Sequence, residues 1–178
     1  MLLNSHTYYS YKFGTLSIDE LIDEAIGKGY NSLVLTDINN TSATIDFIRR
    51  CEGKDLRPVV GIDFRNGAQQ QYIGIARNNS GFQKLNEHLT MHLHEKADFA
   101  ERAPEMEDVY FIYPVGKVHP KLLRENEFIG VKPTQISKIF GDLRNHREKL
   151  VVLQPVTFRH KRAFNINRLL RPRANHTS

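Results

Sequence analysis

Residues 32–37 read Ser-Leu-Val-Leu-Thr-Asp, a short apolar run that ends in a carboxylate. A second run of this kind, Pro-Val-Val-Gly-Ile-Asp-Phe, occupies residues 58–64. Short apolar runs between helical patterns are typical of strands that are buried on both faces. We therefore expect two neighbouring parallel strands here. Their core side chains should be Leu33, Val34, Leu35, Val59, Val60 and Ile62.

A helix is expected directly before the first of these runs. Ser17 and Glu20 have the spacing of a capping box, in which each side chain satisfies a free backbone amide at the helix start. An apolar stripe then follows at helical spacing, made of Leu21, Ile22, Ala25 and Ile26. Gly29 suits the left-handed conformation that commonly ends a helix. These features predict a helix between Ser17 and Gly29.

The later patterns also alternate between helices and strands. Asn66 and Gly67 both tolerate positive φ, so they predict a tight hairpin into the next strand. A helix is expected at 42–52, with Ile45, Ile48 and Cys51 on one side. Another should begin at Ser80 and bury Phe82, Leu85 and Leu89, and a third is expected at 134–140. Strands are expected at 2–7, 70–76, 109–113, 128–131 and 150–153, and a charged loop at 95–107.

This alternation predicts an α/β fold with parallel pairing and right-handed crossovers. Both an α/β barrel and an open, doubly wound sheet satisfy the pattern. No glycine-rich phosphate loop follows the first predicted strand, which argues against a dinucleotide-binding fold.

The composition is that of one ordinary domain. The 178 residues are 40% hydrophobic and 25% charged, which is sufficient for a single core. No apolar run approaches the roughly 18 residues that a membrane span needs, and the N-terminus lacks the pattern of a signal peptide. Cys51 is the only cysteine, so no internal disulfide can form. We expect Cys51 in the core and the protein in a reducing cytoplasm.

Positive charge gathers towards the C-terminus. The formal net charge is +5, and residues 143–178 contain nine Lys and Arg residues against one acid, Glu148. A run of this kind is usually a solvated face or tail, which is the interpretation we favour. It also offers a weak, salt-sensitive contact with DNA.

Three side chains fall at or near the C-terminal ends of the first three predicted strands, namely His6, Asp37 and Asp63. In a parallel barrel these strand ends converge on one face, where functional sites are built. An imidazole and two carboxylates could ligate a divalent metal ion. The structural interpretation remains open beside this one, because a histidine at a strand end is often hydrogen-bonded, and an aspartate before a helix often forms a cap or a turn.

A second group of histidines lies on the helix predicted from Ser80. His88 and His92 are one helical turn apart, and His94 follows. Such a pair can bind zinc. No acidic or cysteine partner of obvious geometry accompanies it, so we favour a solvated or partly packed helix end.

Together the motifs resemble the PHP domains (the polymerase-and-histidinol-phosphatase fold) of bacterial DNA polymerase III α subunits. In that family the first motif holds two histidines and a serine, the next two read Thr-Asp-His-Gly-Asn and Gly-x-Glu-Phe, and a run Ala-Lys-Asn-x-x-Gly-Tyr follows in the polymerase branch. The matching segments here occur in the same order. They are residues 3–10 (Leu-Asn-Ser-His-Thr-Tyr-Tyr-Ser), 35–40 (Leu-Thr-Asp-Ile-Asn-Asn), 60–64 (Val-Gly-Ile-Asp-Phe) and 75–82 (Ile-Ala-Arg-Asn-Asn-Ser-Gly-Phe).

The resemblance implies a distorted parallel barrel of about seven strand–helix units. We expect it to cover residues 1–170 as one part of a larger polymerase chain, with a disordered tail at 171–178. The last family motif, an Asp-x-His pair, is not found in the sequence. We therefore expect the barrel to be incomplete at its C-terminal end.

The departures from the family pattern fall on its metal ligands. Active relatives hold up to three metal ions, but the ligand positions here contain Asn4, Phe13, Ile38 and Gln71. Ile and Phe have no lone pair to offer, and neutral amides are weak ligands for transition metals. His6 and Asp63 remain as the matched pair, with Asp37 beside them. The comparison implies a degenerate site with no metal and no catalytic residue.

The resemblance implies two alternative functions, which differ in the number of metal ligands that the site must hold. The first is a non-catalytic domain of a DNA-directed DNA polymerase that stabilises the rest of the chain or docks a proofreading exonuclease. The second is a metal-dependent phosphoesterase or pyrophosphatase, which would use Zn or Mn at the residual site. The missing ligands favour the first.

Overall fold

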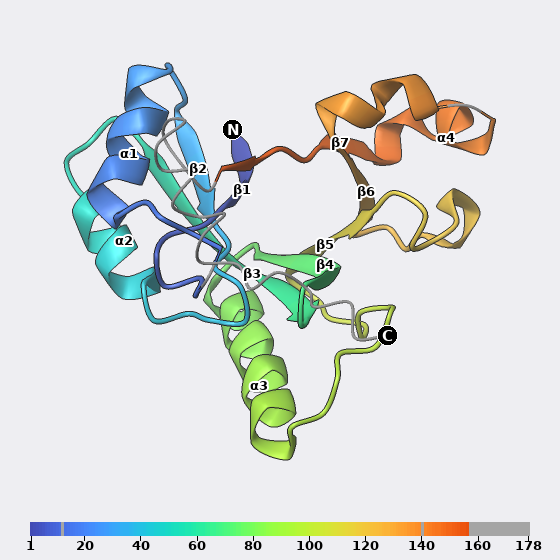
Figure 1. The fold of residues 1–178 in the computed structure, drawn as a ribbon, viewed down its shortest axis with the longest axis horizontal. Helices are drawn as coiled ribbons and strands as arrows, with labels where there is room; N and C mark the ends of the chain where they lie inside the picture. The colour runs from blue at the N-terminus through green and yellow to red at the C-terminus, as the bar shows by residue number, and fades with distance from the viewer. Residues whose placement is uncertain (12, 140, 157–178) are drawn as a thin grey trace, which may run out of the picture.

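A computed structural model describes residues 1–11, 13–139 and 141–156, and within them one curled sheet of eight strands forms the centre of the fold (Figure 1). Their order across the sheet is β7-β6-β5-β4-β3-β2-β1-β8. The strands are β1 (Leu2–Ser5), β2 (Ser32–Leu35), β3 (Arg57–Asn66), β4 (Gln69–Ala76), β5 (Val109–Pro114), β6 (Glu127–Val131), β7 (Leu150–Val152) and β8 (Pro155–Val156).

The two outermost strands of the sheet are neighbours in the chain. β7 and β8 lie at opposite ends of the strand order, yet only Leu153 and Gln154 separate them. The chain therefore crosses from one edge of the sheet to the other, as Figure 1 shows. On the β7 side of this crossing, Leu153 N donates a hydrogen bond to Val131 O of β6 at 2.9 Å. On the β8 side, His6 N donates to Val156 O, also at 2.9 Å. The α/β class is confirmed, and the curled sheet is consistent with a barrel.

The prediction of an all-parallel barrel is wrong for β4. β1, β2 and β3 pair in parallel, as do β5, β6 and β7, but β4 runs antiparallel to both β3 and β5. The cause is the predicted hairpin, in which Gly67 has a φ of 57°. Two residues between strands are too few for the crossover that parallel pairing requires.

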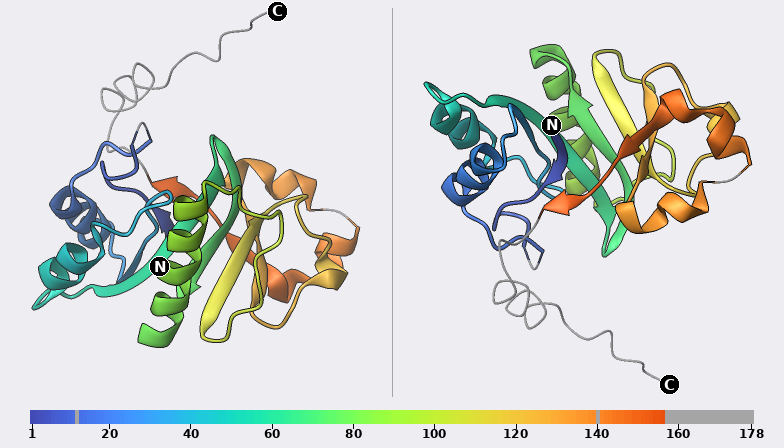
Figure 2. Two further views of the ribbon diagram at one scale, coloured as in Figure 1. Left: turned by 90° about the horizontal axis from the view of Figure 1, so that it is seen from below. Right: turned by 90° about the horizontal axis from the view of Figure 1, so that it is seen from above.

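The longer helices cover the outer face of this sheet. α1 and α2 pack beside β1–β3, and α3 packs on β3–β5 (Figure 2). The predicted capping box at Ser17 and Glu20 is confirmed, and Gly29 has the expected positive φ of 73°. The described helices are α1 (Ile18–Gly27), α2 (Thr44–Cys51), α3 (Asn79–Glu95) and α4 (Asp142–Asn145), with 3-10 helices η1 (Pro120–Leu122), η2 (Pro133–Lys138) and η3 (Arg147–Lys149).

Alternation along the strands separates an outer core from an inner one. Leu33 and Leu35 of β2 pack against α1 and α2, whereas Val34 between them joins the cluster on the inner face. The inner cluster is apolar and contains Ile75 and Ile112. On β3 the same alternation puts Val59, Asp63 and Arg65 on one face of the strand. The interior of the curled sheet is therefore apolar towards one end and polar towards the other.

Several predicted core positions need correction. Val59 and Val60 are half-buried, although the other four predicted residues of β2 and β3 are buried. On α2 the buried residues are Thr44, Phe47 and Cys51, whereas Ile45 and Ile48 are 55% and 37% exposed. The ring of Phe47 occupies the packed face of α2 in place of the two isoleucines. Cys51 is buried, as predicted.

Two further differences lie outside the central sheet. The α-helix predicted for 134–140 is a 3-10 helix from Pro133 to Lys138, and residue 140 lies outside the described residues. Gly141, with a φ of 59°, interrupts the helical pattern there. Residues 96–107 contain no strand or α-helix, in agreement with the predicted loop. Of the described helices, none combines the length and apolar character that a membrane crossing requires.

Of the histidines of α3, His88 and His92 are half-buried against the outer core and His94 is exposed, in agreement with the favoured interpretation of a solvated or partly packed helix end. His88 Nε2 lies 2.8 Å from the hydroxyl of Tyr72, and His92 stacks on Phe99 with ring centroids 4.6 Å apart. Burial, together with the nearby charge of His92, lowers the pKa of His88 from 6.5 to about 4. His88 is therefore a neutral, half-buried residue at neutral pH.

We predict that Leu35→Ala lowers the free energy of unfolding by about 2–5 kcal/mol, because it leaves a cavity in the outer core. Leu35 is 2% exposed. Ile45→Ala is the matched control, since the same kind of truncation at an exposed position should cost about 0.5 kcal/mol or less. Urea unfolding of both variants measures this difference. Equal costs for the two variants would contradict the burial pattern.

A second prediction concerns acid. The pKa of His88 is lower in the folded state than in the unfolded chain. The contribution of His88 to the free energy of unfolding is therefore fully present above pH 6.5 and is lost as the pH falls towards about 4. His88→Gln should therefore flatten the loss of stability between these two pH values, and His94→Gln, at an exposed position, should not. Urea unfolding at several pH values measures both. A wild-type slope in His88→Gln would show that His88 is not the group responsible.

Candidate functional site

The polar end of the curled sheet brings two of the three predicted site residues into contact. His6 directly follows β1, Asp37 is the second residue after β2, and Asp63 lies near the end of β3. His6 Nε2 lies 3.1 Å from Asp63 Oδ2, and both side chains are buried. Asp37 is joined to Asp63 through the backbone, from Asp63 N to Asp37 O at 3.2 Å. Its carboxylate makes other contacts.

Asp63 is the centre of this polar end. Its Oδ2 accepts hydrogen bonds from Arg65 Nη2 at 2.6 Å and from Arg65 Nε at 3.1 Å, in addition to the contact with His6. Its Oδ1 accepts from Gln70 Nε2 at 2.9 Å. Asp63 is 0% exposed. Both oxygens of the buried carboxylate are therefore occupied by donors from the protein itself.

The charge state of Asp63 follows from these contacts. Burial alone raises the pKa of a carboxyl group, but the hydrogen bond with His6 and the positive charge of Arg65 oppose it and together lower the pKa of Asp63 below its ordinary value. Asp63 is thus ionised at neutral pH. A buried carboxylate of this kind is tolerated because it is paired and hydrogen-bonded.

Asp37 makes a separate set of hydrogen bonds. Its Oδ1 accepts from Thr7 N at 2.7 Å and from Ser10 Oγ at 2.6 Å, and its Oδ2 accepts from Thr7 Oγ1 at 2.7 Å. These bonds tie the loop after β1 to the end of β2. The geometry is that of a residue that orders a loop.

Asn4 and Ile38, two of the four positions compared with family ligands, also make hydrogen bonds between the segment around β1 and the end of β2. The side-chain oxygen of Asn4 accepts a hydrogen bond from Thr36 Oγ1 at 3.1 Å. The backbone amide of Ile38 donates to Ser10 Oγ at 2.9 Å. Neither contact leaves a metal ligand facing His6 and Asp63.

The other two positions are in contact with cations of the protein. The guanidinium of Arg65 lies 4.9 Å from the centre of the Phe13 ring. Gln71 Oε1 accepts from Lys117 Nζ at 3.0 Å, and Lys117 also pairs with Glu101 at 3.3 Å. Two positive side chains therefore stand at the polar end of the sheet.

Sequence reasoning missed three residues of this site, namely Arg65, Gln70 and Lys117. Arg65 follows Asp63 by two positions on the same strand, so the alternation of β3 already places both side chains on one face. Gln70 lies just beyond the predicted hairpin, which folds it back beside β3. Lys117 is 46 residues from Gln71 in the chain, and no local pattern points to it.

The arrangement does not fit a multi-metal centre. A metal ligand needs a free lone pair, and every carboxylate oxygen of Asp63 and Asp37 already accepts at least one hydrogen bond from the protein, which leaves few lone pairs for a metal ion. The guanidinium of Arg65 beside Asp63 would repel a divalent cation. His6 Nδ1 and Ser5 Oγ are buried without a hydrogen-bond partner among the described residues. Over that same part of the chain, no three His, Cys, Asp or Glu side chains group closely enough to hold a metal ion.

Comparison with known proteins agrees with the family suggested by the motifs. A stretch of 83 residues is 35% identical to the DNA polymerase III subunit alpha of Ureaplasma parvum, and one of 89 residues is 29% identical to that of Bacillus subtilis. Each covers 47% of this chain and 8% of the relative. A stretch of 88 residues is 30% identical to an error-prone DNA polymerase of Symbiobacterium thermophilum, covering 49% of this chain and 8% of that protein.

The matched stretches thus span only 8% of the length of these relatives. The family model described as the PHP domain covers much more of this chain, from residue 3 to residue 150. That range runs from β1 to the first residue of β7 and contains the whole polar end of the sheet. The chain therefore belongs to the PHP-domain family.

Proposed function

We propose that this chain is the PHP domain of a replicative DNA polymerase of the DNA polymerase III α type, and that the domain has a structural rather than a catalytic role. Similarity to DNA polymerase III α subunits over about half of the chain supports the first part. The relatives are far longer than the matched stretch, so the template-directed synthesis would be performed by other parts of such a chain.

One observation supports the structural role above all. Asp63, the carboxylate that corresponds to a family ligand, is already held by Arg65, His6 and Gln70. In a metal-dependent phosphoesterase the metal lowers the pKa of a bound water and so produces the nucleophile. A carboxylate that is neutralised by an internal guanidinium contributes little to holding such a metal. The rival phosphoesterase or pyrophosphatase activity, with Zn or Mn, therefore receives no support from this geometry.

In the proposed role, the polar end stabilises the domain. The buried network joins the ends of β1 and β3 to the start of β4, and it keeps this face of the sheet in one arrangement. The rest of the polymerase chain is the partner we expect, and docking of a proofreading exonuclease stays a prediction. The same holds for the cytoplasmic location and for the extent of the domain, 1–170. The predicted tail, 171–178, lies outside the described residues.

The basic segment 143–178 falls mostly outside the described residues, which end at 156. Within the described part, Lys149 Nζ donates to the backbone oxygens of Arg124 at 2.9 Å and Glu125 at 2.8 Å. Lys149 is thus engaged within the domain. A weak contact of this segment with DNA stays a prediction.

We predict that the purified chain, after dialysis against zinc or manganese and then buffer, retains no stoichiometric metal and hydrolyses no phosphodiester. His6→Ala should lower stability without abolishing any activity. Elemental analysis and hydrolysis of a chromogenic phosphodiester measure these properties. His94→Ala is the matched control, because His94 is an exposed histidine and is not among the residues that contact Asp63.

The opposite result would identify the rival function. One or more retained metal ions per chain, with turnover that His6→Ala abolishes and His94→Ala preserves, would refute the structural role. It would leave the family assignment untouched.

A further inference from the structure

A large pocket lies at the end of the curled sheet opposite to the His6–Asp63 pair. Its volume is about 710 Å³, within the range of small-molecule sites. The parallel strands β3, β5 and β6 enter this end, since Val59, Tyr110 and Phe128 lie in their first halves. β4 runs the other way and ends here at Ala76. The pocket is therefore separate from the polar site.

The lining of this pocket is mainly apolar. The inner face of the sheet supplies Leu3, Val34, Val59, Ile112 and Val151. On the other side of β3, Ile45 and Ile48 of α2 and Phe82 of α3 extend the apolar surface. Ile45 and Ile48, which α2 does not bury against the sheet, therefore form part of the pocket wall. An apolar body would bury this surface on binding.

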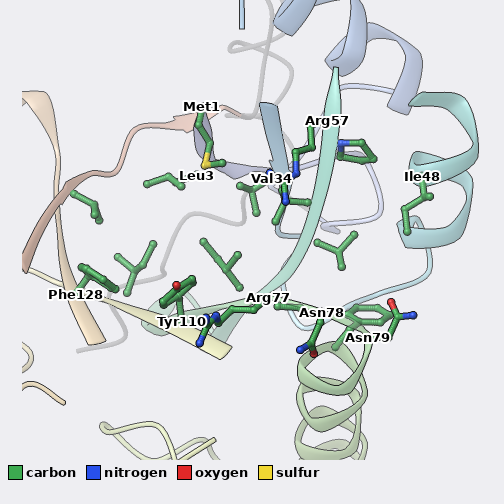
Figure 3. A pocket seen from close by; sticks show the side chains of 18 of the residues that line it. Met1, Leu3, Val34, Ile48, Arg57, Arg77, Asn78, Asn79, Tyr110 and Phe128 are labelled. Atoms are coloured by element: carbon green, nitrogen blue, oxygen red, sulfur yellow. The ribbon is translucent and has the colours of Figure 1, made fainter. Parts of the chain in front are cut away.

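The charges on the lining are all positive. Arg57 begins β3 and Arg77 directly follows β4, and Figure 3 shows both among the side chains of the pocket. The lining contains no aspartate or glutamate. Among the described residues neither guanidinium has a carboxylate partner, and Arg77 lies 5.1 Å from the ring centre of Tyr110. Both arginines are exposed.

From this combination we infer that the pocket binds an amphipathic anion, an elongated apolar molecule with one carboxylate of the fatty acyl class. The apolar part would occupy the inner face of the sheet. The carboxylate would lie at the rim, where the guanidinium of Arg57 or that of Arg77 can donate charge-assisted hydrogen bonds. A neutral apolar ligand would leave both cations unused, and a cationic one would be repelled. The site is independent of the role proposed for the domain, because it shares no residue with the polar end.

The test uses three probes with the same chain length and different head groups, namely dodecanoate, dodecanol and dodecyltrimethylammonium, below their micelle concentrations. Isothermal titration calorimetry should show saturable binding of one dodecanoate per chain, and thermal unfolding should shift to higher temperature because the ligand binds the folded state. The neutral and cationic probes should bind at least about tenfold more weakly, because they lose the charge-assisted bonds.

Two surface variants locate the site. Arg57→Gln combined with Arg77→Gln should weaken dodecanoate by about tenfold or more without altering the fold, since both side chains are exposed. Arg49→Gln, an exposed arginine of α2 that does not line the pocket, is the matched control and should bind as the wild type does.

Three results with the isolated chain would overturn the assignment. They are the absence of saturable dodecanoate binding, equal binding of the cationic probe, and wild-type affinity in the double variant. If dodecanoate bound the isolated chain but not a polymerase that contains it, protein would cover this pocket, and the small anion would be excluded as its occupant.

Discussion

The buried carboxylate of Asp63 is the constraint on which the polar end of this fold depends. An isolated charge in a protein interior is costly, and it is tolerated only where donors surround it. Here the donors come from three places, His6 after β1, Arg65 on β3 itself and Gln70 on β4. Removing one partner of such a buried pair typically costs about 3–5 kcal/mol, because the other charge is left uncompensated. The carboxylate of Asp63 thus links three strands of the sheet.

The interior of the curled sheet divides into two regions with different chemistry. At the polar end, the carboxylate oxygens of Asp37 and Asp63 accept hydrogen bonds from the protein, so few of their lone pairs remain to hold a metal ion. At the other end, Arg57 and Arg77 stand beside an apolar pocket, and neither has a carboxylate partner within the described part of the chain. The first region supports the structural role that we propose for the domain. The second provides a place where a molecule from outside the domain can bind.

Local patterns could be predicted from the sequence, whereas contacts between distant segments could not. The capping box at Ser17 and the turn at Gly67 involve neighbouring residues, and both are present. The buried face of α2 depends on where the sheet lies, so the periodicity of Ile45, Ile48 and Cys51 did not reveal that Phe47 occupies the core. The direction of β4 was implicit in the predicted hairpin, but the parallel interpretation overlooked it. His6 and Asp63 were found from family motifs and strand ends. Arg65 could have been found by strand alternation, whereas Lys117 could not.

The carboxyl resonance of Asp63 tests the central claim most directly. Carbon-13 NMR would follow this resonance as pH is lowered from neutrality, with and without an equivalent of zinc. We predict a carboxylate that stays ionised below the ordinary aspartate pKa of 3.8, because Arg65 and His6 stabilise its charge. The resonance should not move when zinc is added. A pKa above the ordinary value, or a zinc-dependent shift of the resonance, would contradict the view that protein donors have replaced the metal.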